Sequence, residues 1–169
     1  DILAIVWITW TMNFVGWSGG VEGQLPGIVV IAALTIAALS LRYSADITQW
    51  PVIILALILA GAYLGFLPWN FYPQKIMPGY GGKALAGYLL GTLAILSSVK
   101  LGTALLVLAV PAIDSIYVGM SRIFRGQNPM LGGRNHLQHR LLDAGWAKWQ
   151  IALFYWGVSG ILGVIALNV

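Results

Sequence analysis

Long apolar runs recur along this chain, and they limit what it can fold into more than any other feature. A helix that crosses a bilayer needs about 20 mostly apolar residues, or fewer where neighbouring helices shield its ends. Only 8% of the 169 residues are charged and 59% are hydrophobic, whereas roughly a quarter of a soluble domain is charged. The absence of cysteine excludes disulfides and thiolate metal sites. We therefore expect an all-α, polytopic membrane protein.

The apolar runs predict about six transmembrane helices. We expect them over residues 2–10, 27–41, 51–66, 85–97, 101–118 and 150–167, with the fifth interrupted by Pro111 and Asp114. None of these runs alternates polar and apolar residues as a strand would, so helices are favoured. The chain opens within an apolar run and without a methionine. We expect a single transmembrane domain over residues 1–169 that forms the C-terminal portion of a longer protein.

The basic residues predict which loops face the cytoplasm. Residues 11–25, 67–84 and 119–149 form alternate loops, and these contain most of the lysines and arginines. These cations are Lys75, Lys83, Arg122, Arg125, Arg134, Arg140 and Lys148. The opposite side has only Arg42 and Lys100. The positive-inside rule then places the three long loops on the cytoplasmic side of the cell (inner) membrane, and loops on a rigid scaffold commonly carry the chemistry.

The first two of these loops are rich in glycine. In the first, Glu22 is the only charged residue. The glycines of this loop would let the backbone approach a ligand closely, although a flexible turn has the same composition.

In the second, aromatic residues suit the membrane–water boundary, and the turn over residues 79–83 opens a helix. Its free N–H groups beside Lys83 could bind phosphate, but the spacing of a P-loop is absent.

The third loop holds both histidines of the chain, His136 and His139, between Arg134 and Arg140. Histidines three residues apart can share a helix face and bind zinc, but the H-E-x-x-H pattern of zincins is absent. Arginines would repel a cation and grip phosphate in a bidentate manner. We therefore interpret the loop as an anion site. Contact with anionic lipid head groups is the alternative.

Taken together, the loops resemble those of the polyprenyl-phosphate N-acetylhexosamine-1-phosphate transferase family, the membrane glycosyltransferases that start lipid I, O-antigen and teichoic-acid synthesis. Residues 13–24 resemble the family's N-x-x-N-x-x-D-G-x-D-G-L loop, and residues 67–83 its aromatic–proline stretch with a G-D-S-G-S turn. Residues 111–114 resemble its P-x-x-D helix, and residues 136–145 its H-x-H-H-R-L-L-x-x-G loop. Family residues are replaced at Gly16 (asparagine), Gly19 (aspartate), Glu22 (aspartate), Tyr80 (a magnesium-binding aspartate) and Gln138 (histidine).

The resemblance implies the transfer of an N-acetylaminosugar-1-phosphate from a UDP-sugar to polyprenyl (undecaprenyl) phosphate, with Mg²⁺ as cofactor. It further implies that this happens at the cytoplasmic membrane face, in cell-envelope glycan synthesis. By the same resemblance, catalytic roles are expected for Asn13, Glu22, His136 and His139, with Glu22 also as the metal ligand. Substrate binding is expected from Lys75, Tyr80, Lys83, Arg134 and Arg140.

Two functional hypotheses stay open at this point. One is an active transferase with a partly rebuilt metal site, and the other is a catalytically degenerate relative that binds polyprenyl phosphate or partners an active transferase. The expected partners are the UDP-N-acetylaminosugar, the polyprenyl phosphate, membrane lipid and a second copy of the chain, but no nucleic acid. A transporter is disfavoured, because no inverted repeat is visible. Asp114 lies within a predicted span, where a carboxylate is either functional or satisfies a neighbouring helix.

Overall fold

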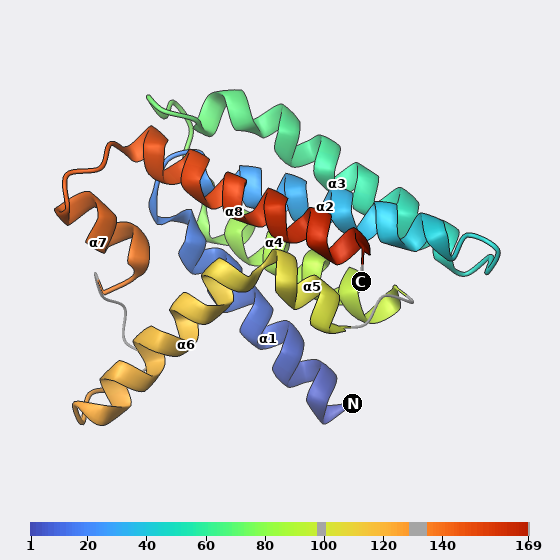
Figure 1. Cartoon of the computed structure of the whole chain (residues 1–169), viewed down its shortest axis with the longest axis horizontal. Helices are drawn as coiled ribbons and strands as arrows, with labels where there is room; N and C mark the ends of the chain where they lie inside the picture. The colour runs from blue at the N-terminus through green and yellow to red at the C-terminus, as the bar shows by residue number, and fades with distance from the viewer. Residues whose placement is uncertain (98–100, 129–134, 169) are drawn as a thin grey trace.

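A computed structural model describes residues 1–97, 101–128 and 135–168, and within these ranges every regular element is a helix (Figure 1). The elements are α1 (Ile2–Trp17), a 3₁₀ turn η1 (Ser18–Gly20), α2 (Gln24–Arg42), α3 (Gln49–Asn70), α4 (Tyr80–Leu96), α5 (Leu101–Val107), α6 (Ala109–Phe124), α7 (Leu137–Asp143) and α8 (Lys148–Asn168). The predicted all-α class is confirmed.

Four helical segments are long and apolar enough to cross a membrane: Ile2–Gly20, Gln24–Arg42, Gln49–Asn70 and Lys148–Asn168. Of the other two predicted spans, the one over residues 85–97 corresponds to α4, which has 17 residues. The one over residues 101–118 is divided into α5 and α6. The division falls at Leu108, ahead of the interruption predicted at Pro111 and Asp114. Pro111 is tolerated because it is the third residue of α6, where a missing N–H removes no intrahelical bond.

Helix α2 forms the centre of the bundle. Most of its side chains are buried, including Ile28, Val29 and Ile36, and it contacts α3, α8 and α4. By contrast, α3 exposes apolar residues such as Ile54 and Ile58. A helix that is apolar all round belongs in a core, while exposed apolar faces on its neighbours suit lipid contact. The arrangement is that of a polytopic helical membrane protein.

Helices α1 and α4 approach each other very closely at two glycines of α4. A Cβ atom on Gly87 would lie 2.5 Å from the Cα atom of Met12, and one on Gly91 would lie 3.2 Å from the Cβ atom of Thr11. The Trp7 indole also donates a hydrogen bond to the Gly91 carbonyl, at 3.0 Å. Small residues permit this kind of helix contact in membranes. It places the end of α1 beside the beginning of α4.

Three inter-helix segments gather at one end of the bundle, on the left in Figure 1: residues 18–23, residues 71–79 and the region of α7. The turn between α2 and α3 lies at the opposite end (Figure 1). This grouping agrees with the alternate loops predicted to share one side. The boundaries differ, however. Because Phe14 and Val15 are buried against the core, α1 continues to Trp17, and Asn13 and Gly16 lie on a helix instead of in a loop.

Candidate functional site

A cavity of about 390 Å³ opens between the end of α1, the beginning of α4, α6 and α7. Its volume is within the usual range for small-molecule sites, roughly 300–1,000 Å³. Five of the nine residues predicted for the site line it: Asn13, Tyr80, Lys83, His136 and His139. The three loops singled out by sequence therefore do meet in one place. Arg134, also predicted, lies outside the described residues.

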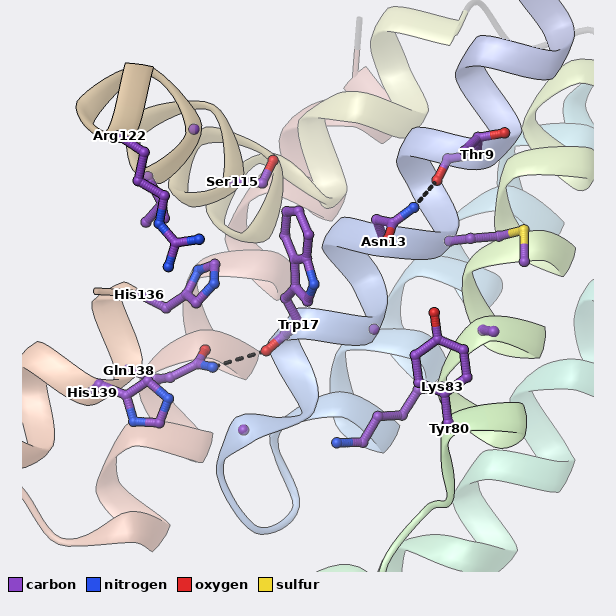
Figure 2. A pocket seen from close by; sticks show the side chains of 16 residues that line it. Thr9, Asn13, Trp17, Tyr80, Lys83, Ser115, Arg122, His136, Gln138 and His139 are labelled. Atoms are coloured by element: carbon purple, nitrogen blue, oxygen red, sulfur yellow. Dashed lines mark hydrogen bonds between the residues drawn. The ribbon is translucent and has the colours of Figure 1, made fainter. Parts of the chain in front are cut away.

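Lys83 enters this cavity from the first turn of α4 (Figure 2). Its amine donates a hydrogen bond to the Gly19 carbonyl, at 2.9 Å. Burial of the side chain lowers the pKa of Lys83 from the ordinary lysine value, because desolvation disfavours the charged form. Within the described part of the chain, Lys83 has no carboxylate in ion-pair range. Its positive charge therefore faces the cavity without a counter-ion from these residues.

Asp114 holds His136 in place. One carboxylate oxygen lies 2.8 Å from Nδ1 of His136, and the other accepts the backbone N–H of Leu137 at 2.7 Å. The imidazole also packs near the Trp17 ring, with ring centroids 5.5 Å apart. A hydrogen bond at one ring nitrogen determines which nitrogen is left for other chemistry. Asp114 thus acts as a positioning residue, and Nε2 of His136 is the nitrogen available to a ligand.

Gln138 stands where the resemblance would place a histidine, and it is a buried structural residue. Its side-chain amide donates to the Trp17 carbonyl at 2.8 Å and accepts from the Gln24 amide at 3.1 Å. These bonds connect α7 with the end of α1 and with α2. Because a buried amide needs partners for both of its ends, this chain of hydrogen bonds fixes the wall of the cavity that α7 forms.

Arg122 is the site residue that the sequence analysis did not select. It lies in the cavity wall on α6 with only 7% of its surface exposed, and it forms no ion pair with the described residues. Figure 2 shows its guanidinium on the same side of the cavity as His136. Asp114, Val118 and Arg122 are spaced at i, i+4 and i+8, which puts them on one helix face. That spacing in the sequence could have identified Arg122 as a residue on the same side of the helix as Asp114.

Three other predicted residues lie elsewhere. Glu22 pairs with Lys148, at 2.6 Å, and lines a separate cavity of about 120 Å³. The Lys75 amine lies 5.6 Å from the centre of the Trp69 ring, and the Arg140 guanidinium lies 5.6 Å from that of Tyr117. All three are charged groups with a structural partner. The main cavity therefore lacks the carboxylate that was expected to bind metal.

The residues around the main cavity do not fit Mg²⁺. This ion prefers hard oxygen ligands, usually one or two carboxylates beside phosphate and water. No Asp or Glu is among the described residues that line the cavity, and no cluster of three potential metal ligands occurs in the described part of the chain. Both oxygens of the nearby Asp114 already accept hydrogen bonds. The donors present, Lys83 and Arg122, suit an anion instead.

Comparison with known proteins gives a consistent picture. Residues 2–98 match the model of the family described as "Glycosyl transferase family 4". The chain is 32% identical to the decaprenyl-phosphate N-acetylglucosaminephosphotransferase of Mycolicibacterium smegmatis, over 89% of this chain and 42% of that protein. It is 29% identical to the phospho-N-acetylmuramoyl-pentapeptide-transferase of Moorella thermoacetica, over 98% of this chain and 51% of that protein. The chain thus spans about half the length of these relatives.

Proposed function

The chain belongs to glycosyl transferase family 4, and we propose that it transfers a sugar-1-phosphate to a polyprenyl phosphate, as the names of the similar proteins from Mycolicibacterium smegmatis and Moorella thermoacetica suggest for those proteins. An N-acetylaminosugar-1-phosphate would pass from a UDP-sugar to polyprenyl (undecaprenyl) phosphate. The observation that carries this proposal is the cavity between α1, α4, α6 and α7, in which Lys83 and Arg122 present positive charge without a carboxylate partner among the described residues.

The cavity offers the functions that phosphoryl transfer needs from a protein. Such a reaction depends mainly on positioning the reactants and on stabilising negative charge. Lys83 and Arg122 would hold phosphate oxygens, and Nε2 of His136 would contact the reacting phosphates from an orientation set by Asp114. Because the residues present do not fit Mg²⁺, no step is assigned to that ion. The catalytic roles of Asn13, Glu22 and His139 stay predictions from the resemblance.

A second candidate is a relative that binds the phosphorylated lipid or nucleotide sugar without turnover. The observation that favours it is the same cavity's lack of a carboxylate among its described lining residues. Without a carboxylate, the usual means of holding a divalent ion on the donor diphosphate is missing. Binding and turnover must therefore be measured separately.

Turnover is tested with purified protein in detergent, supplied with undecaprenyl phosphate and either UDP-N-acetylglucosamine or UDP-N-acetylmuramoyl-pentapeptide. The transferase proposal expects UMP release that depends on the lipid phosphate and a matching lipid-linked sugar product. Binding of both substrates without UMP would establish the second candidate in its place. Binding of neither would refute both. Arg122→Gln should reduce binding about 10- to 100-fold, because a hydrogen bond to a charged group contributes about 1.5–3 kcal/mol.

The proposal also places the cavity on the cytoplasmic side of the inner membrane, following the distribution of positive charge. The chain has no cysteine, so single cysteines can be introduced without a background. An impermeant thiol reagent applied to intact cells should label Ala45→Cys and miss Gln127→Cys; both residues are exposed in the structure. Labelling of Gln127→Cys from outside would refute this orientation.

A further inference from the structure

The side chain of Lys83 packs against Gly16 near the end of α1 and against Gly19 in the turn η1. A Cβ atom on Gly19 would lie 2.9 Å from Cε of Lys83 and 3.2 Å from its Cδ, and one on Gly16 would lie 3.8 Å from its Cβ. Any side chain at residue 19 would therefore collide with Lys83 in its present position. Lys83 thus takes up the space that a side chain at residue 19 would use, while at Gly16 it makes only an ordinary van der Waals contact.

The position of the Lys83 ammonium is held from two directions. At its tip, the amine donates to the Gly19 carbonyl at 2.9 Å. At its base, the Tyr63 hydroxyl donates to the Gly82 carbonyl at 2.6 Å, which secures the first turn of α4. An ammonium group has three N–H donors. With one used by Gly19, two are left for a ligand in the cavity.

Arg122 provides the second charge of the cavity. Figure 2 shows it with His136 on one side, while Lys83 extends towards the centre from the other side. The side chain is buried, and a guanidinium can bind two oxygens of one phosphate in a planar fork, whereas an ammonium acts as a point charge. Both cations line the same cavity, so a phosphorylated ligand inside it has hydrogen-bond donors on two sides.

We propose that Lys83 takes the place of a divalent metal, so that this cavity binds the phosphate group of its ligand through a tethered ammonium and the Arg122 guanidinium and does not require Mg²⁺. The ligand class is a phosphorylated compound, either the diphosphate of a nucleotide sugar or the phosphate of a lipid. The inference rests on the proposed function for this choice of ligands. A bound ammonium also opposes a cation beside it, since like charges repel.

The test is a binding titration of the purified protein in lipid nanodiscs, with UDP-N-acetylglucosamine in one arm and undecaprenyl phosphate in the other. Each arm is run with EDTA and with Mg²⁺. At least one ligand should bind with about the same dissociation constant in both buffers. Lys83→Gln should then raise that constant about tenfold or more, the effect of losing one hydrogen bond to a charged group. The arm that responds identifies the source of the phosphate.

Arg125→Gln is the matched control, since it removes one positive charge from the exposed end of α6, outside the cavity lining. It should leave the dissociation constant unchanged. Lys83→Arg keeps the charge and should retain more affinity than Lys83→Gln, which separates loss of charge from loss of folding. Binding that disappears in EDTA, or equal affinities for wild type and a folded Lys83→Gln protein, would overturn the inference. Metal-free binding without UMP release would refute only transferase activity, whereas Mg²⁺-dependent release that is insensitive to Lys83 would refute only this inference.

Discussion

The close contact between α1 and α4 leads to a quantitative prediction for Gly87→Ala. The added Cβ atom would lie 2.5 Å from Met12 Cα and 2.6 Å from the Thr11 carbonyl oxygen. Both are backbone atoms, so no change of side-chain rotamer can relieve the collision. An ordinary van der Waals contact begins at about 3.5 Å. The two helices must therefore separate locally by about 1 Å, or the backbone of α1 must bend by a similar amount.

Overpacking of this kind costs about 1–3 kcal/mol. For a chain of this size, each kcal/mol lowers the melting temperature by about 2–4 °C. Gly87→Ala should therefore lower the melting temperature by about 2–12 °C, even though alanine is a better helix former than glycine by about 1 kcal/mol. Gly87 lies one helical turn from Lys83, and Met12 directly precedes Asn13, so the separation should also widen the cavity and weaken phosphate binding.

The assay is tryptophan fluorescence during heating of the protein in detergent, with Gly61→Ala as control. A Cβ atom on Gly61 of α3 would have no heavy atom within 4 Å, so this variant should melt at the wild-type temperature or slightly above. If Gly87→Ala melts with Gly61→Ala, or above it, the helices do not approach as closely as described and the reasoning fails.

Four further predictions concern charged residues in or near the candidate site. Asp114→Asn should lower the melting temperature by about 3–12 °C, since it weakens hydrogen bonds to His136 and Leu137 that contribute about 1.5–3 kcal/mol; an unchanged temperature would contradict its positioning role. Lys148→Ala should lower the free energy of unfolding by at most about 1 kcal/mol, because its ion pair with Glu22 is partly exposed. Glu22→Gln should abolish sugar transfer if the catalytic role predicted for Glu22 is right, and retained transfer would refute that role. Burial lowers the pKa of Lys83, so phosphate affinity should fall as pH rises through a value below that of an exposed lysine, and Lys83→Arg should not show this fall; identical pH profiles would refute the contribution of Lys83.

The membrane helices were predictable because the length of an apolar run relates directly to bilayer thickness. Their ends were less so. The first span was predicted to end at residue 10, but α1 ends at Trp17. The local sequence does not show this extension, because burial of Phe14 and Val15 depends on partners elsewhere in the chain. Similarly, α6 continues to Phe124, into the loop predicted from residue 119. The sequence had placed Arg122 in that loop because a charged residue usually marks the end of a membrane span.

The candidate site was predictable where its residues came from the three loops themselves. Asn13, Lys83 and His136 do line one cavity. The position of Glu22 was not predictable, since its partner Lys148 is 126 residues away in sequence and only the fold brings them together. The space that Lys83 occupies also depends on the close approach of α1 and α4, which sequence spacing does not reveal.

The hydrogen bonds of Gln138 have a consequence for how the cavity comes into being. Helix α7 has seven residues, and isolated helices shorter than about 12–15 residues are marginal in water. Its order must therefore come from docking, in which Gln138 joins the Trp17 carbonyl and the Gln24 amide. That docking surface exists only after α1 and α2 have packed, so this wall forms late in folding. A ligand that contacts His136 would slow amide hydrogen exchange in α7, and its measured affinity would include the docking equilibrium.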